Sequence, residues 1–231
     1  MTTLTYLGHS AFLLEADGKA VAIDPFLTGN PAASCAESDI HPGTILLTHA
    51  HNDHVGDTIA IAKRTGAQVI STYELGSWLA GQGVEHTTAG NHGGTIAFDG
   101  GTAKIVPAWH TSSYHDGERY VAIGVPAGFV VRFGGRSIYF AGDTCLFGDM
   151  NLIGDEGLDA AAIPIGDHFT MGPKDAVRAA TFLRAGTVVP CHYDTFPPIR
   201  QDAAAFAAAV REATGGASAV APLKPGASLA L

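Results

Sequence analysis

Short apolar runs separated by turn residues predict three strands at the start of the chain. The stretch LTYLGHSAFLLEADGKAVAIDP, residues 4–25, contains three such runs. The residues ADGK at 16–19 predict a hairpin turn between the second and third runs. Asp24 precedes Pro25 and therefore prefers extended backbone, which closes the third run. We expect the order strand, turn, strand, turn, strand.

The next part of the chain alternates between strand and helix patterns. TILLT at 44–48 and AQVIS at 67–71 are short apolar runs typical of buried strands. DTIAIAKRTG at 57–66 predicts a helix that ends near the glycine, and TYELGSWLAGQG at 72–83 predicts another. A helix between two buried strands predicts a parallel pair with a crossover connection.

Strand patterns return over residues 93–141, with hairpin turns expected at PAG (126–128) and FGGRS (133–137). After residue 149 the chain alternates again, with expected helices at 149–157, 173–186 and 200–215 and expected strands at 158–165 and 187–193. Both halves therefore contain several strands followed by helix–strand units. No linker or low-complexity stretch divides the chain, so we expect one domain over residues 1–231, with sheets covered by outer helices.

Composition narrows the range of partners. Hydrophobic residues make up 46% of the 231 residues, enough for a sizeable core, and the net charge of −9 argues against a nucleic-acid surface. A small anionic substrate is still compatible with this negative net charge, because a bound metal would supply positive charge at the site. No apolar run suits a membrane span or a signal peptide, and three cysteines form no disulfide framework, so we expect a cytoplasmic protein. The low charged fraction of 15% is compatible with a homo-oligomer.

The stretch LTHAHNDHVGD, residues 47–57, concentrates metal-ligand side chains. His49 and His51 stand two residues apart at a strand end, so both rings can face one ion. Asp53 and His54 follow where the chain turns into a helix, and they can face a second position beside the first. A solvated histidine-rich loop is the alternative, but four ligand-type residues within six positions favour a metal site.

Three later residues end strand-like runs and could complete the coordination. His110 ends AKIVPAWH, Asp143 ends SIYFAGD, and His192 ends TVVPCH. Each one taken alone is more typical of a capped or solvated side chain. Together with the cluster at 49–54, and because loops gather at one rim of a sheet, they are candidate ligands.

These motifs resemble those of the metallo-β-lactamase superfamily. THAHNDH is similar to its T-H-x-H-x-D-H signature, the later His, Asp and His follow in its order, and Asp24 matches its early structural aspartate. YLGHSAF, IDPFLTGNP, GDHFTMGP and HYDTFPP resemble a group of metal-dependent hydrolases related to L-ascorbate-6-phosphate lactonase. The resemblance implies an α/β (α+β) fold, a four-layer αββα sandwich of two mixed sheets with helices outside.

The resemblance also implies two metal sites. His49, His51 and His110 would hold one ion, Asp53, His54 and His192 the other, and Asp143 would bridge them. Imidazole and carboxylate ligands suit Zn, and also Mn, Ni or Fe. Two divalent ions about 3.5–4 Å apart could hold a bridging hydroxide that attacks a small ester-type substrate, namely a lactone, phosphodiester, thioester or acyl ester. Asp53 would also be catalytic as an orienting group and proton acceptor.

Further residues have open roles. His9 could line the pocket or simply form a turn, and Asp24 is expected to support a ligand. His168 is a candidate catalytic residue that contacts substrate or stabilises an oxyanion, the alternative being a loop histidine that caps the next helix. The polar and aromatic stretch at 110–120 is a candidate lid.

Two other functions compete with hydrolysis. One is a metal-binding protein with a structural or regulatory role, although an open bridging position argues against it because structural sites are usually closed. The other is redox chemistry at two irons. Members of the superfamily with that chemistry usually carry Glu where this chain has His51, which favours hydrolysis.

Overall fold

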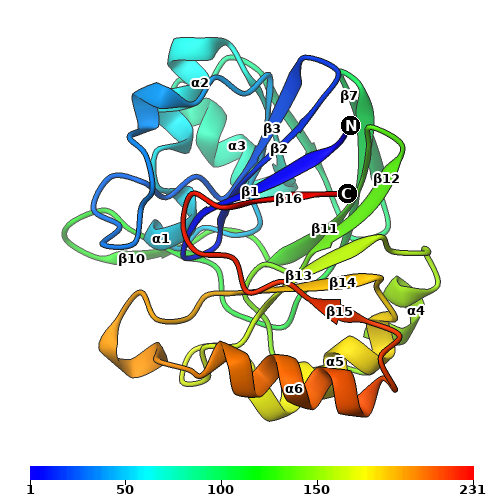
Figure 1. Cartoon of the computed structure of the whole chain (residues 1–231). Helices are drawn as coiled ribbons and strands as arrows, with labels where there is room; N and C mark the ends of the chain where they lie inside the picture. The colour runs from blue at the N-terminus through cyan, green and yellow to red at the C-terminus, as the bar shows by residue number, and fades with distance from the viewer.

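The computed structural model describes residues 1–231 and contains two seven-stranded sheets with helices on their outer sides (Figure 1). The first sheet has the order β16-β1-β2-β3-β4-β5-β6 and the second the order β15-β14-β13-β12-β11-β8-β7. A separate hairpin pairs β9 with β10. The strands of the first sheet are β1 (Thr3–Gly8), β2 (Ala11–Ala16), β3 (Lys19–Ile23), β4 (Thr44–Leu46), β5 (Gln68–Thr72), β6 (Thr87–Gly90) and β16 (Ser228–Ala230).

The remaining elements follow the same chain order. The strands of the second sheet are β7 (Thr95–Phe98), β8 (Gly101–Pro107), β11 (Ala127–Phe133), β12 (Arg136–Phe140), β13 (Ala160–Pro164), β14 (Thr187–Cys191) and β15 (Ala219–Val220), and the hairpin strands are β9 (Ser113–His115) and β10 (Tyr120–Ala122). The helices are α1 (Asn52–Val55), α2 (Thr58–Thr65), α3 (Tyr73–Gly81), α4 (Met150–Gly154), α5 (Pro173–Leu183) and α6 (Ala203–Ala213), with 3-10 turns at Glu37–Asp39 and Pro197–Ile199. None of these helices combines the length and hydrophobicity that crossing a bilayer would require.

Three hydrophobic clusters define four layers. The central cluster lies between the sheets and includes Phe12 and Leu46 from the first sheet and Phe129 and Phe140 from the second. A second cluster packs helices α1 to α3 on the outer face of the first sheet, and a third packs α4 to α6 on the outer face of the second. Figure 1 shows these two helix layers on opposite sides of the molecule. The expected arrangement of two mixed sheets with helices outside is confirmed.

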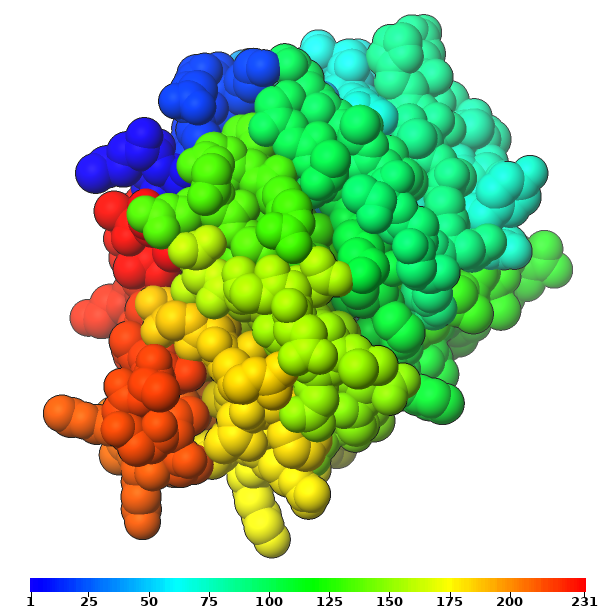
Figure 2. Space-filling view, turned by 90° about the vertical axis from the view of Figure 1, so that its right-hand side faces the viewer, coloured from blue at the N-terminus to red at the C-terminus, as the bar shows by residue number.

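The pairing of strands also follows the hydrophobic pattern. The first three strands form an antiparallel meander, and β3, β4 and β5 run parallel, with α2 in the crossover between the last two. The strand β16 returns to pair with β1, so the two ends of the chain lie side by side. Figure 2 shows the blue N-terminal and red C-terminal residues next to each other on one face.

One predicted turn is wrong. The residues PAG at 126–128 do not form a hairpin, because β10 pairs with β9 and Ala127 and Gly128 belong to β11, opposite Pro107 and Val106 of β8. A side chain at position 128 would place its Cβ 2.9 Å from the carbonyl oxygen of Phe140. Gly128 therefore permits a close approach between neighbouring strands rather than a turn. The strand β6 was not expected from the pattern.

Strand ends from both sheets meet at one rim of the molecule. The backbone N–H of His192, directly after β14, donates to the carbonyl of His9, directly after β1, at 2.7 Å. The N–H of Ala127 in β11 donates to the carbonyl of Thr48, shortly after β4, at 3.0 Å. These two bonds join the first sheet to the second, and they bring the loops that carry the candidate ligands together.

Candidate metal centre

Two adjoining groups of imidazole and carboxylate side chains lie at this rim. In each group, one donor atom from every residue lies within 4.8 Å of the donor atoms of the others. One group consists of His49, His51, His110 and Asp143, and the other of His9, Asp53, His54 and His192. The structure therefore brings together all seven residues that the sequence singles out as ligands, and it adds His9.

The first group is built from the loop after β4 and the ends of β8 and β12. His49 Nε2 lies 3.0 Å from His51 Nδ1, and His110 Nε2 lies 3.6 Å from Asp143 Oδ2. Burial lowers the pKa of all three histidines, and the neighbouring imidazoles lower it further. The rings are therefore neutral near pH 7, with a lone pair on each for a metal ion.

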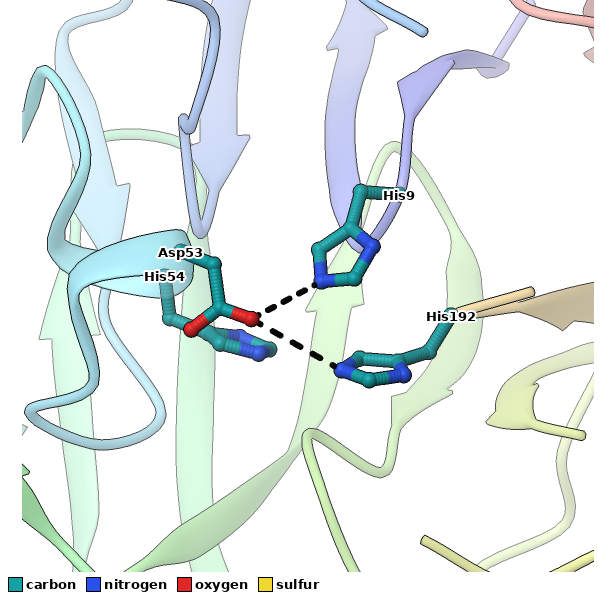
Figure 3. Close-up of side chains that lie close together, drawn as sticks. All are labelled: His9, Asp53, His54 and His192. Atoms are coloured by element: carbon teal, nitrogen blue, oxygen red, sulfur yellow. Dashed lines mark hydrogen bonds and ion pairs between the residues drawn. The ribbon is translucent and has the colours of Figure 1, made fainter. Parts of the chain in front are cut away.

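The second group surrounds Asp53, the second residue of the short helix α1 (Figure 3). Asp53 Oδ2 lies 3.2 Å from His9 Nε2 and 4.0 Å from His192 Nε2. Burial disfavours the charged carboxylate, but the hydrogen bond from His9 and the charge on His54 outweigh that effect, so the pKa of Asp53 is lowered. Asp53 is thus ionised and faces the two histidines from the helix.

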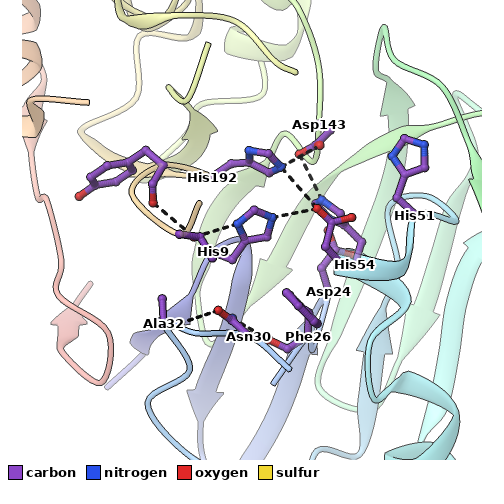
Figure 4. A network of polar contacts seen from close by, with 12 residues as sticks. His9, Asp24, Phe26, Asn30, Ala32, His51, His54, Asp143 and His192 are labelled. Atoms are coloured by element: carbon purple, nitrogen blue, oxygen red, sulfur yellow. Dashed lines mark hydrogen bonds and ion pairs between the residues drawn. The ribbon is translucent and has the colours of Figure 1, made fainter. Parts of the chain in front are cut away.

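Asp143 belongs to the first group and also lies beside His54 and His192 of the second (Figure 4). Its carboxylate oxygens are 3.0 Å from His192 Nε2, 3.3 Å from His54 Nε2 and 3.6 Å from His110 Nε2. Burial alone would raise the pKa of Asp143, but the neighbouring imidazoles of His192 and His54 lower it well below its usual range. A permanently charged, buried carboxylate at this position faces donors of both groups at once.

Asp24 supports the centre from behind. Its Oδ1 accepts the backbone N–H of Thr48 at 2.9 Å, and its Oδ2 accepts the Thr48 hydroxyl at 2.7 Å and His54 Nδ1 at 2.8 Å. Because a carboxylate only accepts, His54 carries a proton on Nδ1 and turns Nε2 towards Asp143. The expected supporting role of Asp24 agrees with these contacts.

Buried polar atoms at the centre lack hydrogen-bond partners. They include His54 Nε2, both ring nitrogens of His192 and Asp143 Oδ1. Burial opposes a charge on His54, yet Asp143 and Asp24 on either side raise its pKa well above its usual range. The centre thus attracts positive charge, and unpaired nitrogen and oxygen donors without thiolate suit divalent ions. The residues present fit the metal centre that the sequence predicts.

The backbone is unusual where these residues leave their strands. His9, Asp24 and His192 all adopt positive φ angles, of 60°, 44° and 52°. Side chains other than glycine rarely adopt this left-handed region, and such strain concentrates at functional sites. It turns each side chain sharply at the strand end towards the shared centre.

His9 is the residue whose role the sequence left open. It is fully buried, with Nδ1 3.0 Å from Thr195 Oγ1 and Nε2 facing Asp53. Burial, followed by the neighbouring imidazole of His192, lowers the pKa of His9 to about 4. The sequence signal that could have found it is its position at the end of an apolar run, as for His110 and His192.

Five residues of the two groups, namely His51, Asp53, His110, Asp143 and His192, line a cavity of about 610 Å³. Its lining residues are Phe26, His51, Asn52, Asp53, His110, Thr111, His115, Tyr120, Asp143, Phe169, His192 and Phe196. The hairpin β9–β10 contributes His115 and Tyr120 to the cavity lining, and a lid at 110–120 stays a prediction. Asn52 fastens this hairpin to α1, because its Nδ2 donates to the carbonyl of His115 at 3.0 Å and its Oδ1 accepts the N–H of His115 at 2.9 Å.

His168 lies apart from the donor groups. Its ring is exposed and packs edge-on against Phe169 at a centroid distance of 4.5 Å, and Phe169 rather than His168 lines the cavity. The catalytic role of His168 therefore stays a prediction.

Replacing His168 with alanine tests this role. We expect KM to rise a few-fold with kcat nearly unchanged, because the ring supports Phe169 at the cavity wall and does not reach the donor groups. Steady-state kinetics of metal-loaded enzyme measure both constants. A fall in kcat of about a hundredfold or more, as for the loss of an oxyanion donor, would instead support the catalytic role.

Comparisons with known proteins agree with this geometry. A model of the beta-lactamase superfamily domain matches residues 3–192. A UPF0173 metal-dependent hydrolase from Thermus thermophilus is 54% identical over 213 residues, 92% of each chain, and one from Pelotomaculum thermopropionicum is 47% identical over 99% of each. The solved structure of Igni18, a metallo hydrolase from Ignicoccus hospitalis, superposes with a TM-score of 0.88 at 38% identity, covering 99% of this chain and 97% of that one.

Proposed function

Because the chain belongs to the metallo-β-lactamase superfamily, among its metal-dependent hydrolases, we propose that it holds two divalent ions and hydrolyses a small ester-type bond. His49, His51 and His110 would hold one ion, Asp53, His54 and His192 the other, and Asp143 would bridge them. The observation that carries the proposal is the convergence of two donor groups, with unpartnered buried atoms, at one cavity. Zn is the metal we favour, with Mn, Ni or Fe as alternatives.

Bound divalent ions would supply Lewis acidity, which lowers the pKa of water and polarises a carbonyl or phosphoryl oxygen. The chain's own residues orient the reaction. Asp53 is ionised, partly exposed to the cavity, and held by His9, so its carboxylate can accept a hydrogen bond from water and orient it. Thr195 in turn fixes the ring of His9, and Asp24 fixes that of His54.

An open cavity argues against a purely structural metal site. Five candidate ligands, His51, Asp53, His110, Asp143 and His192, line the cavity and are reachable by a small molecule. Structural sites usually close all coordination positions with protein side chains. We also infer that residues 1–231 act as one hydrolase domain, since the central cluster draws on both sheets.

Removal and return of metal tests the proposal. We expect chelator-treated protein to lose hydrolysis of 4-nitrophenyl acetate or bis(4-nitrophenyl) phosphate, and to regain it with Zn or Mn up to two ions per chain. Binding to the folded state alone should also stabilise the protein by about 2.7 kcal/mol at about a hundred times the Kd. Elemental analysis, turnover and thermal unfolding measure these effects.

Two results would contradict the proposal. If activity were already saturated at one ion per chain, the proposal of a centre with two ions would be wrong. Bound iron with a visible absorption band, and no turnover of any ester, would favour the redox alternative.

A further inference from the structure

Four aromatic side chains from four separate segments of the chain line the cavity. Phe26 follows β3, Tyr120 begins β10, Phe169 lies between β13 and α5, and Phe196 follows β14. Tyr120 is 75% exposed and Phe169 is 54% exposed. Large apolar side chains held open to water around a concave site are typical of a surface that a ligand covers.

Basic side chains are missing from the same cavity. None of the 13 lysine and arginine residues of the chain is among its lining residues. Seven of these lysine and arginine residues form ion pairs with carboxylates outside the cavity, namely Lys19, Arg64, Lys104, Arg119, Arg132, Arg136 and Arg184. A phosphate or carboxylate group on the substrate would therefore find no lysine or arginine partner in the cavity, where His115 is the one basic side chain outside the metal centre.

The neutral polar side chains of the wall are also largely engaged. The side-chain amide of Asn52 bonds to the backbone of His115 through both its nitrogen and its oxygen. The Thr111 hydroxyl lies 3.3 Å from His51 Nε2. A polyhydroxylated sugar needs many free donors and acceptors, and each group that it buried without a partner would weaken binding. This wall offers aromatic surface instead.

We propose that the substrate is a neutral ester or lactone that carries an aromatic or similarly bulky apolar group beside the scissile bond. This inference rests on the proposed hydrolase function. Water adds to the carbonyl carbon, the C–O bond to the leaving oxygen breaks, and the products are a carboxylate, a proton and an alcohol. The apolar group packs between Phe26, Tyr120, Phe169 and Phe196 above the metal centre. A phosphorylated sugar lactone, the class implied by the sequence resemblance, is the opposing outcome of the test.

Three esters with the same leaving group test the substrate class. They are 4-nitrophenyl acetate, 4-nitrophenyl phenylacetate and 4-nitrophenyl hemisuccinate, which add a methyl, a neutral aromatic and an anionic acyl group. With Zn-loaded enzyme we expect kcat/KM for the phenylacetate to exceed that for the acetate by about tenfold or more, and the hemisuccinate to be the poorest. A preference for the hemisuccinate would overturn the substrate class and leave the hydrolase function standing.

Matched variants locate the preference. Tyr120→Ala and Phe169→Ala should each reduce the ratio of phenylacetate to acetate kcat/KM by about threefold to tenfold. Tyr73→Ala should leave that ratio unchanged, because Tyr73 is a 59% exposed tyrosine on α3, outside the cavity. An unchanged ratio in both cavity variants would overturn the aromatic wall. Turnover of none of the three esters would overturn the substrate class. If bis(4-nitrophenyl) phosphate is then still hydrolysed, the proposed hydrolase function stands; if it is not, that function is contradicted as well.

Discussion

Replacing Asp143 with alanine is expected to empty both halves of the metal centre and to lower kcat/KM by about a thousandfold or more. Asp143 is buried and lies within 3.6 Å of donor atoms on His54, His110 and His192, which belong to both groups. Its removal takes away the one carboxylate that faces both groups and leaves their histidines without a shared negative partner. Metal content by elemental analysis and ester turnover should fall together.

His192→Ala is the matched comparison for this variant. His192 belongs to the second group only, so we expect it to lose mainly one ion and to keep partial occupancy at His49, His51 and His110. Far-UV circular dichroism of both variants shows whether the fold is kept, and Asp143→Asn keeps the size of the side chain if alanine destabilises it. An Asp143→Ala protein with two ions and full activity would falsify the bridging role.

Replacing Asp24 with asparagine is expected to damage metal affinity although Asp24 faces away from the cavity. The carboxylate accepts three hydrogen bonds, two from Thr48 and one from His54. An amide has one acceptor oxygen, so its NH₂ group would face a donor and the ring of His54 would lose its orientation. Losing such an outer partner typically costs about 10- to 100-fold in metal affinity, and the unpaired buried group costs about 1–3 kcal/mol of stability.

Asp57→Ala is the control that separates these two effects. Asp57 is also a buried carboxylate, and its Oδ2 accepts two hydrogen bonds from the backbone N–H groups of Leu27 and Thr28, but it contacts no candidate ligand. We expect it to lower the melting temperature while leaving the affinity for Zn within about twofold. Competition with a chromophoric chelator measures the affinity of both variants. Equal loss of affinity in the two would show that Asp24 acts through general stability rather than through His54.

Most of the strand and helix order was readable from the hydrophobic pattern, because that pattern reports which side of each element is buried. The three N-terminal strands, the crossover helix after His54 and the helices of the second half all appear where the pattern predicts them. The hairpin at 126–128 was wrong, because Gly128 in a strand looks the same in the sequence as Gly128 in a turn. Only the neighbouring carbonyl of Phe140 distinguishes the two.

The cluster of candidate ligands at 49–54 was determined by the sequence alone, because its four side chains are neighbours along the chain and a strand end followed by a helix suffices to group them. The partnership of Asp143 with both groups, the placement of His9 against Asp53 and the aromatic wall were decided by the tertiary structure. These contacts join residues far apart in the chain, and they exist because the two sheets meet at one rim, where His192 bonds to His9. Local periodicity carries no information about such long-range packing. The charges and the shape of the cavity are therefore set by the way the two sheets pack together.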